Sequence, residues 1–81
     1  MPITPEQCRM ARAGLQMTLR QLSDRAMVPP SVISRFENDV SPGQPEALAR
    51  IQRVFVARGV EFLNGGAPGV RLRAVDQDER N

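Results

Sequence analysis

Apolar residues recur every three to four positions over most of the chain, which is the period of an amphipathic helix. Start and stop signals divide this pattern into four predicted helices. Thr4 and Thr18 each open a capping box, Pro30 and Pro45 occupy favourable first helical positions, and Gly59 is a stop signal. The predicted helices are 5–13 or 5–14, 19–26, 30–38 and 45–58.

After Gly59 the apolar period changes to two, which predicts strands at 60–63 and 70–73 around a turn rich in glycine. In this hairpin Glu61 lies opposite Arg71 or Arg73. A hairpin of two strands is marginal in water, so it folds back on the fourth helix or pairs with a second subunit. We favour a homodimer, with a predicted interface made by Val60, Phe62, Leu63, Val70 and Leu72. The predicted divisions are a helical domain at 1–58, a dimerisation hairpin at 59–73 and a disordered acidic tail at 74–81.

All 11 basic residues of this 81-residue chain are arginines, and ten of them precede residue 74, where only six acidic residues occur. A basic body with an acidic tail suits a polyanionic partner. Because the chain has one cysteine and no histidine, we expect no metal site, no cofactor and no enzyme activity.

The same inventory bears on the compartment and on the core. The sequence shows no apolar stretch long enough to span a membrane and no signal-peptide pattern. Its single cysteine, Cys8, suits a reducing cytoplasm. We expect Cys8 to be buried as a small hydrophobe. Met10, Met17 and Met27 are expected to fill the core.

Residues 19–38 form the central motif, in which two short helices are joined by a turn of about three residues. Such a connection makes the second helix project from the surface. The apolar positions expected to face inward are Leu22, Ala26, Val28, Ile33 and Phe36. The positions expected to face outward are Ser31, Ser34 and Arg35.

Over residues 4–58 the sequence resembles the Cro/CI-type, or XRE, family of phage-repressor-like helix-turn-helix proteins. The matching residues are Gln7, Arg12, Thr18, Leu22, Val28, the run Ile33-Ser34-Arg35-Phe36-Glu37-Asn38, Pro45, Leu48 and Ile51. The resemblance implies a mainly α fold, a lambda-repressor-like bundle of four to five short helices, here with a C-terminal β-hairpin. It also implies a bacterial transcriptional regulator that binds palindromic double-stranded operator DNA.

In this family the third helix lies in the major groove, and its N-terminal end contacts the bases. The resemblance places base contacts at Pro30, Ser31, Ser34 and Arg35. It places phosphate contacts at Asn38, Ser41 and Gln44, and the N-terminus of the second helix, whose free N–H groups favour an anion, adds Thr18 and Arg20. Arg12 and Glu37 match positions that form a structural ion pair. Arg35 is the strongest base-reading candidate, because a guanidinium can bind O6 and N7 of guanine together.

Four positions depart from the family pattern, and one of them is a small change, Ser23 in place of the usual alanine at the tight helix contact. Met27 stands where the turn usually has glycine, Pro29 where a serine or threonine caps the third helix, and Leu19 where a polar residue often contacts phosphate. Pro29, Pro30 and Leu19, together with the acidic tail, favour an alternative. In it the chain is an antitoxin-like or anti-activator module that uses the same fold to bind another protein.

Overall fold

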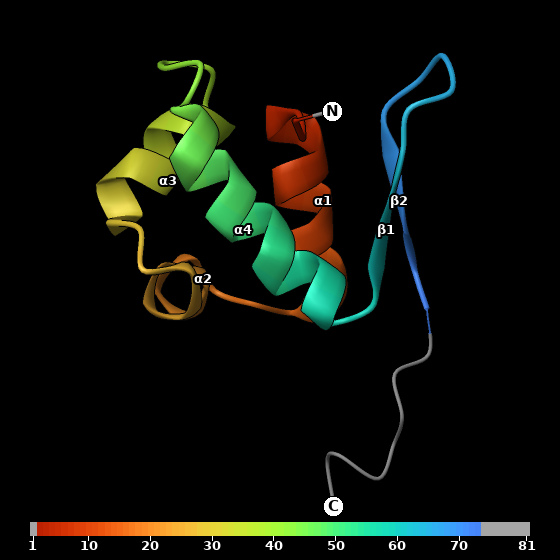
Figure 1. Ribbon diagram of the computed structural model, residues 1–81, viewed down its shortest axis with the longest axis horizontal. Helices are drawn as coiled ribbons and strands as arrows, with labels where there is room; N and C mark the ends of the chain where they lie inside the picture. Colours follow the sequence, from red (N-terminus) through yellow and green to blue (C-terminus); the bar gives the residue numbers. More distant parts are fainter. Residues whose placement is uncertain (1, 74–81) are drawn as a thin grey trace, which may run out of the picture.

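The computed structural model describes residues 2–73, and within that range it contains four helices followed by a two-stranded hairpin (Figure 1). The elements are α1 (Pro5–Leu15), α2 (Leu19–Ala26), α3 (Pro30–Glu37), α4 (Pro45–Ala57), β1 (Val60–Leu63) and β2 (Gly69–Leu72). The predicted mainly α, lambda-repressor-like architecture is confirmed. The predicted acidic tail at 74–81 lies outside the described residues. No helix within residues 2–73 has the length and apolar character needed to span a membrane.

The helix boundaries follow the local signals closely. Thr4 and Thr18 both form complete capping boxes, and α2 has the predicted range. The first helix continues to Leu15, beyond the predicted end, and α3 ends at Glu37, so that Asn38 is its C-terminal cap instead of its last residue. In the hairpin, β2 occupies 69–72, one residue earlier than predicted.

A single apolar core joins the four helices and the start of β1. The five motif residues predicted to face inward are all buried, and so is Cys8. The prediction for the methionines is wrong at two positions. Met17 is buried, but Met10 is 36% exposed and Met27 is 79% exposed. Met27 is exposed because it forms the bend between α2 and α3, where the side chain projects outside the bundle.

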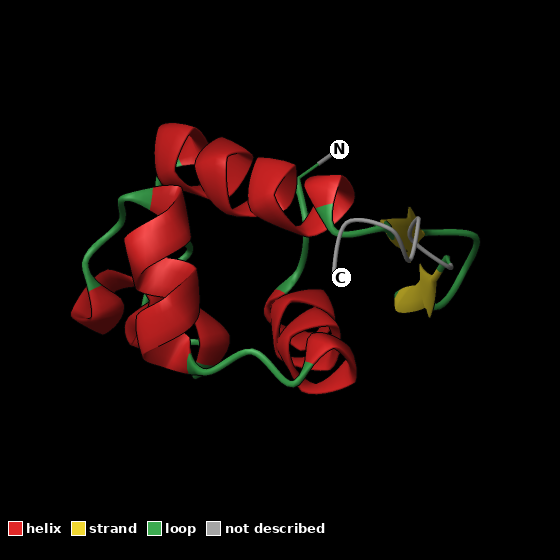
Figure 2. Ribbon diagram, turned by 90° about the horizontal axis from the view of Figure 1, so that it is seen from below, coloured by secondary structure: helices red, strands yellow, loops and turns green. Residues whose placement is uncertain are grey.

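The hairpin lies against one side of the helical bundle, where β2 contacts α1 and β1 contacts α4 (Figures 1 and 2). Its antiparallel register pairs Val60 with Leu72, Glu61 with Arg71, and Phe62 with Val70. Because side chains alternate along a strand, the four predicted apolar residues at 60, 62, 70 and 72 share one face, and Leu63 lies on the other.

The inner face of the hairpin is used within the chain itself. Val60 is part of the core, and Phe62 and Val70 are partly buried against it. The ring of Phe62 lies 6.2 Å from that of Phe55 in α4. On the outer face, the Glu61 carboxylate pairs with the guanidinium groups of both Arg71 and Arg73, as predicted from the period of two.

Gln7 ties the N-terminal end of α1 to the hairpin. Its side chain is fully buried, and its Nε2 lies 3.1 Å from the carbonyl oxygens of Leu63 and Gly69 and from Oδ1 of Asn64. The two hydrogens of this amide are therefore shared among three acceptors. The Oε1 atom of Gln7 accepts the Thr4 backbone N–H in the capping box. One residue thus completes the capping box of α1 and anchors both ends of the hairpin loop.

Candidate nucleic-acid interface

A sharp turn at Met27 sets the angle between α2 and α3. Met27 has φ 58° and ψ 44°, so a non-glycine residue adopts the left-handed conformation that the family usually gives to glycine. This conformation costs a residue with a Cβ atom roughly 1–2 kcal/mol. The turn is held by the Ser23 hydroxyl, which donates to the Val28 carbonyl at 2.6 Å, and by Arg50, which donates to the Met27 carbonyl at 3.4 Å. The turn therefore keeps the family geometry and tolerates the strain.

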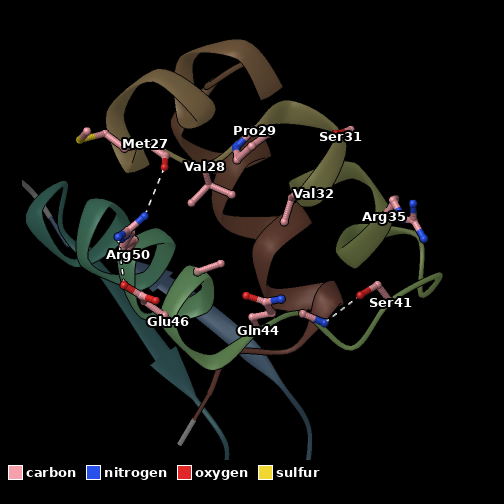
Figure 3. Close-up of a pocket in the computed structure, with 12 residues that line it drawn as sticks. Met27, Val28, Pro29, Ser31, Val32, Arg35, Ser41, Gln44, Glu46 and Arg50 are labelled. Carbon is pink, nitrogen blue, oxygen red and sulfur yellow. Dashed lines mark hydrogen bonds and ion pairs between the residues drawn. The ribbon is translucent and has the colours of Figure 1, made fainter.

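A groove of about 380 Å³ runs between the outward side of α3, the α3–α4 loop and the first turn of α4 (Figure 3). Gly43 in this loop has φ 79°, and a Cβ atom there would lie 3.0 Å from side-chain atoms of both Phe36 and Leu48. Only glycine adopts this positive φ without strain and leaves room for the side chains of Phe36 and Leu48. Gly43 therefore fixes the path of the loop that forms one wall of the groove.

The groove brings together predicted residues of both kinds. Ser31 and Arg35 of α3, predicted to contact bases, line it together with Ser41 and Gln44, predicted to contact phosphates (Figure 3). Arg35 is exposed, and within residues 2–73 no carboxylate pairs with it, so its N–H groups are available to another acceptor.

The remaining predicted contact residues lie outside the groove. Pro30 is exposed at the start of α3, next to Pro29, which does line the groove. Ser34 is half-buried, and its hydroxyl oxygen accepts from the Asn38 side-chain amide at 3.3 Å. The other two, Thr18 and Arg20, are exposed at the start of α2. Leu19 beside them is packed against the core, which explains an apolar residue at that position.

The helix N-termini differ in their capping, and the sequence predicted the missing side-chain cap of α3 but not that of α4. At α2 the Thr18 hydroxyl already accepts the Gln21 N–H, although it keeps its own hydrogen to donate. At α3 and α4 the cap positions are Pro29 and Gln44, and neither makes a side-chain cap hydrogen bond. Pro30 has no N–H, and the Val32 N–H donates to the Pro29 carbonyl at 3.0 Å, so the first turn of α3 leaves only the Ser31 N–H for water or an anion. The first turn of α4 leaves the N–H groups of Glu46 and Ala47, and all three of these residues line the groove. Pro29 has no side-chain oxygen, and Gln44 is not among the residues that usually cap a helix.

The predicted ion pair between α1 and α3 is present. Arg12 donates from Nε and Nη2 to the two carboxylate oxygens of Glu37, each at 2.8 Å, and the Glu37 side chain is only 6% exposed. The Cys8 thiol donates to the same carboxylate at 3.0 Å, and Arg9 donates to the Glu37 carbonyl. Arg12 also donates to the Met17 carbonyl. These bonds fix the C-terminal end of α3 to α1, and thereby fix the orientation of the groove-facing side.

The titration of this cluster follows from its geometry. Burial by itself would raise the pKa of Glu37, but the hydrogen bonds from Arg12 and Cys8 outweigh it and leave that pKa below its ordinary value of 4.5. The hydrogen bond to Glu37 raises the pKa of Arg12. Burial, followed by the contact with Glu37, raises the pKa of the Cys8 thiol, so the thiol stays protonated and acts as a donor.

The lowered pKa of Glu37 predicts a specific loss of stability in acid. A depressed folded-state pKa means that the carboxylate stabilises the fold above the unfolded value of 4.5, and that this contribution is lost as the pH falls through the folded pKa. Glu37→Gln removes the charge at every pH. In urea unfolding, the stability difference between the original chain and Glu37→Gln should therefore be large at pH 7 and shrink toward pH 3. An equal difference at both pH values would contradict this assignment.

Two further groove residues were not identified from the sequence. Val32 is 37% exposed, and its side chain points into the groove (Figure 3). The apolar pattern predicts that Ser31 faces outward and Ile33 inward, and it makes no prediction for Val32, which lies between them. Arg50 reaches back to the Met27 carbonyl from α4, 23 residues later, and no local pattern announces such a contact.

Comparison with known proteins agrees with this geometry. A family model described as Helix-turn-helix matches residues 9–55, which include α2, α3 and their turn and make up more than half of the chain. No curated protein matches the sequence. The extent of the family match, together with the α2–turn–α3 geometry, shows that this chain belongs to the helix-turn-helix family of the Cro/CI (XRE) type, a family of DNA-binding transcriptional regulators.

Proposed function

We propose that this protein is a small cytoplasmic regulator of bacterial type that binds palindromic operator DNA as a homodimer, with α3 in the major groove, and acts by occupying a promoter without a catalytic step. The observation that carries the proposal is the groove in which Ser31 and Arg35 meet Ser41 and Gln44. Residues that contact bases and residues that contact the phosphate backbone of the DNA can then bind the same duplex.

Each residue has a role that follows from its chemistry. Arg35 binds the O6 and N7 atoms of a guanine, and Ser31 bonds to a neighbouring base edge. Pro30 and Ser34 are secondary base contacts, since proline has no N–H donor and Ser34 is half-buried. The proposed phosphate contacts are made by Thr18, Arg20, Asn38, Ser41 and Gln44, assisted by the uncapped N-termini of α3 and α4.

Salt dependence tests the DNA contact. Affinity for duplex DNA should fall steeply with salt, because each phosphate neutralised by a cation releases counterions. Arg20→Ala should weaken cognate and unrelated duplexes alike, and should lower the slope of log K against log salt by about one for each protomer. Fluorescence anisotropy at several salt concentrations measures both effects. Binding without salt dependence, or no retardation of any duplex in a gel shift, would contradict the proposal.

Fewer residues of the hairpin are available for the proposed homodimer interface than the sequence indicated. Val60 lies in the core of its own chain, and Phe62 and Val70 are partly buried there. The exposed apolar side chains that remain in this region are Leu63 and Leu72 of the hairpin and Val56 at the end of α4. A two-fold dimer through this region would present two α3 helices to half-sites about 34 Å apart.

Sedimentation equilibrium checks the oligomeric state directly. We expect a species of twice the 9.0 kDa chain mass at the concentrations that bind DNA. Leu63→Asp should shift the equilibrium toward the monomer, because it places an unpaired charge on an exposed apolar position without disturbing the core. If the unchanged sequence is a monomer, the proposed dimer is wrong, but the proposed contact between one α3 and DNA is unaffected.

The second candidate, a protein-interaction module, is favoured by one observation. Met27, at one end of the groove, is the most exposed of the large apolar side chains in residues 2–73. A flexible methionine on the surface suits a partner protein better than it suits DNA. Purification from cells separates the candidates: a partner that co-purifies with a chain unable to retard DNA supports the module, and DNA retardation supports the regulator.

A further inference from the structure

The outward side of α3 carries one apolar side chain that neither the core nor the base contacts above explain. Val32 is 37% exposed, lines the groove, and lies in the first turn of α3 between Ser31 and the core residue Ile33. Ala47 of α4 lines the same groove, so the groove has an apolar side chain on its α4 wall as well.

We infer that Val32 is a specificity-determining residue that reads the 5-methyl group of a thymine. The inference rests on the proposed DNA-binding function. In the major groove the thymine methyl is the one apolar group among the base-pair edges, and apolar side chains are the groups that recognise it. The polar neighbours Ser31 and Arg35 recognise hydrogen-bonding edges, so Val32 supplies a kind of recognition that they lack.

The position of Val32 predicts where the thymine lies. Residues three apart on a helix are neighbours on one face, with Cβ atoms roughly 5–6 Å apart. Val32 and Arg35 have this spacing, and both line the groove. Base pairs stack at about 3.4 Å. A thymine read by Val32 should therefore lie one or two base pairs from the guanine read by Arg35.

The shape of valine suits a contact of this kind. A β-branched side chain in a helix holds essentially one χ1 rotamer, so its two methyl groups have a fixed position before DNA binds. Threonine has nearly the same shape but replaces one methyl with a hydroxyl. Val32→Thr therefore changes the chemistry of the contact while keeping its volume. Because Val32 is outside the core, the variant should fold like the original chain.

The experiment begins with selection of a preferred site from a random duplex library by the full 81-residue chain. Each thymine of that site is then replaced by deoxyuridine, which pairs with adenine in the same way and lacks only the methyl. One thymine in each half-site, close to the guanine that Arg35 binds, should respond to this replacement. Deoxyuridine at that position should weaken binding by about fourfold, which corresponds to the loss of one buried methyl group. For Val32→Thr, which keeps only one of the two methyl groups, the same replacement should weaken binding clearly less than it does for the original chain.

The possible outcomes separate the inference from the function on which it rests. If a specific site is selected but no deoxyuridine weakens binding, or if Val32→Thr responds like the original chain, the Val32 inference is wrong and the regulator survives. If the library yields no preferred site, the proposed function fails, and the inference with it. A Val32→Thr chain with unchanged circular dichroism and unchanged non-specific affinity is the control for folding.

Discussion

Arg12→Ala is expected to lower the free energy of unfolding by about 3–5 kcal/mol. The substitution leaves the Glu37 carboxylate, which is only 6% exposed, without the two hydrogen bonds of 2.8 Å that Arg12 provides. A chain of this size is stabilised by roughly 4–12 kcal/mol in total, so the loss is a large fraction of the whole. Thermal unfolding followed by circular dichroism should show a Tm lower by at least about 12 °C.

A matched substitution on the surface provides the control. Arg71→Ala also removes an arginine from an ion pair with a glutamate, but that pair is exposed on the outer face of the hairpin. Exposed pairs contribute at most about 1 kcal/mol. The double variant Arg12→Ala/Glu37→Ala should lose less than the sum of its two single variants, because no buried charge is left alone. If Arg12→Ala costs no more than Arg71→Ala, the pair does not orient α3.

Arg35→Ala is expected to remove most of the preference for the cognate site, a loss of about 5- to 150-fold in specific affinity. The reason is the bidentate contact to guanine. The other arginine that lines the groove, Arg50, is bonded to the Glu46 carboxylate and the Met27 carbonyl. Non-specific affinity should fall far less, by the amount expected for the loss of one positive charge. Competition binding with cognate and scrambled duplexes measures the ratio of the two affinities.

Arg25→Ala is the control for the charge of Arg35. Arg25 is an exposed arginine in the last turn of α2 and does not line the groove, so the variant has the same net charge as Arg35→Ala. It should leave the ratio of cognate to scrambled affinity unchanged. An unchanged ratio for Arg35→Ala would mean that another residue reads the guanine.

Most of the fold is specified by short-range signals and could be predicted from the sequence. Thr4 and Thr18 begin helices because their hydroxyls cap them, Pro30 and Pro45 because their fixed φ suits a first helical position, and Gly59 ends α4 with φ 93°. The Arg12–Glu37 pair was found through the resemblance, since 25 residues separate its members and no local pattern joins them.

The features that the sequence could not predict depend on contacts between segments that are distant in the sequence. The hairpin interface was predicted from alternation alone, which shows that Val60 and Phe62 share a face but not that this face packs on α1 and α4. The role of Gln7 depends on acceptors 56 to 62 residues away. The groove required the α3–α4 loop to be placed, and that placement depends on Gly43 packing against Phe36 and Leu48.

Backbone amide shifts of a ¹⁵N-labelled chain, recorded on addition of a cognate duplex, show which surface the DNA covers. If DNA lies against the outward side of α3 and its groove, the largest shift changes should occur at Ser31, Arg35, Ser41 and Gln44. Leu63, on the outer face of the hairpin, should change little. Changes concentrated in the hairpin or on the outer side of α4, with α3 unaffected, would contradict this placement of the DNA.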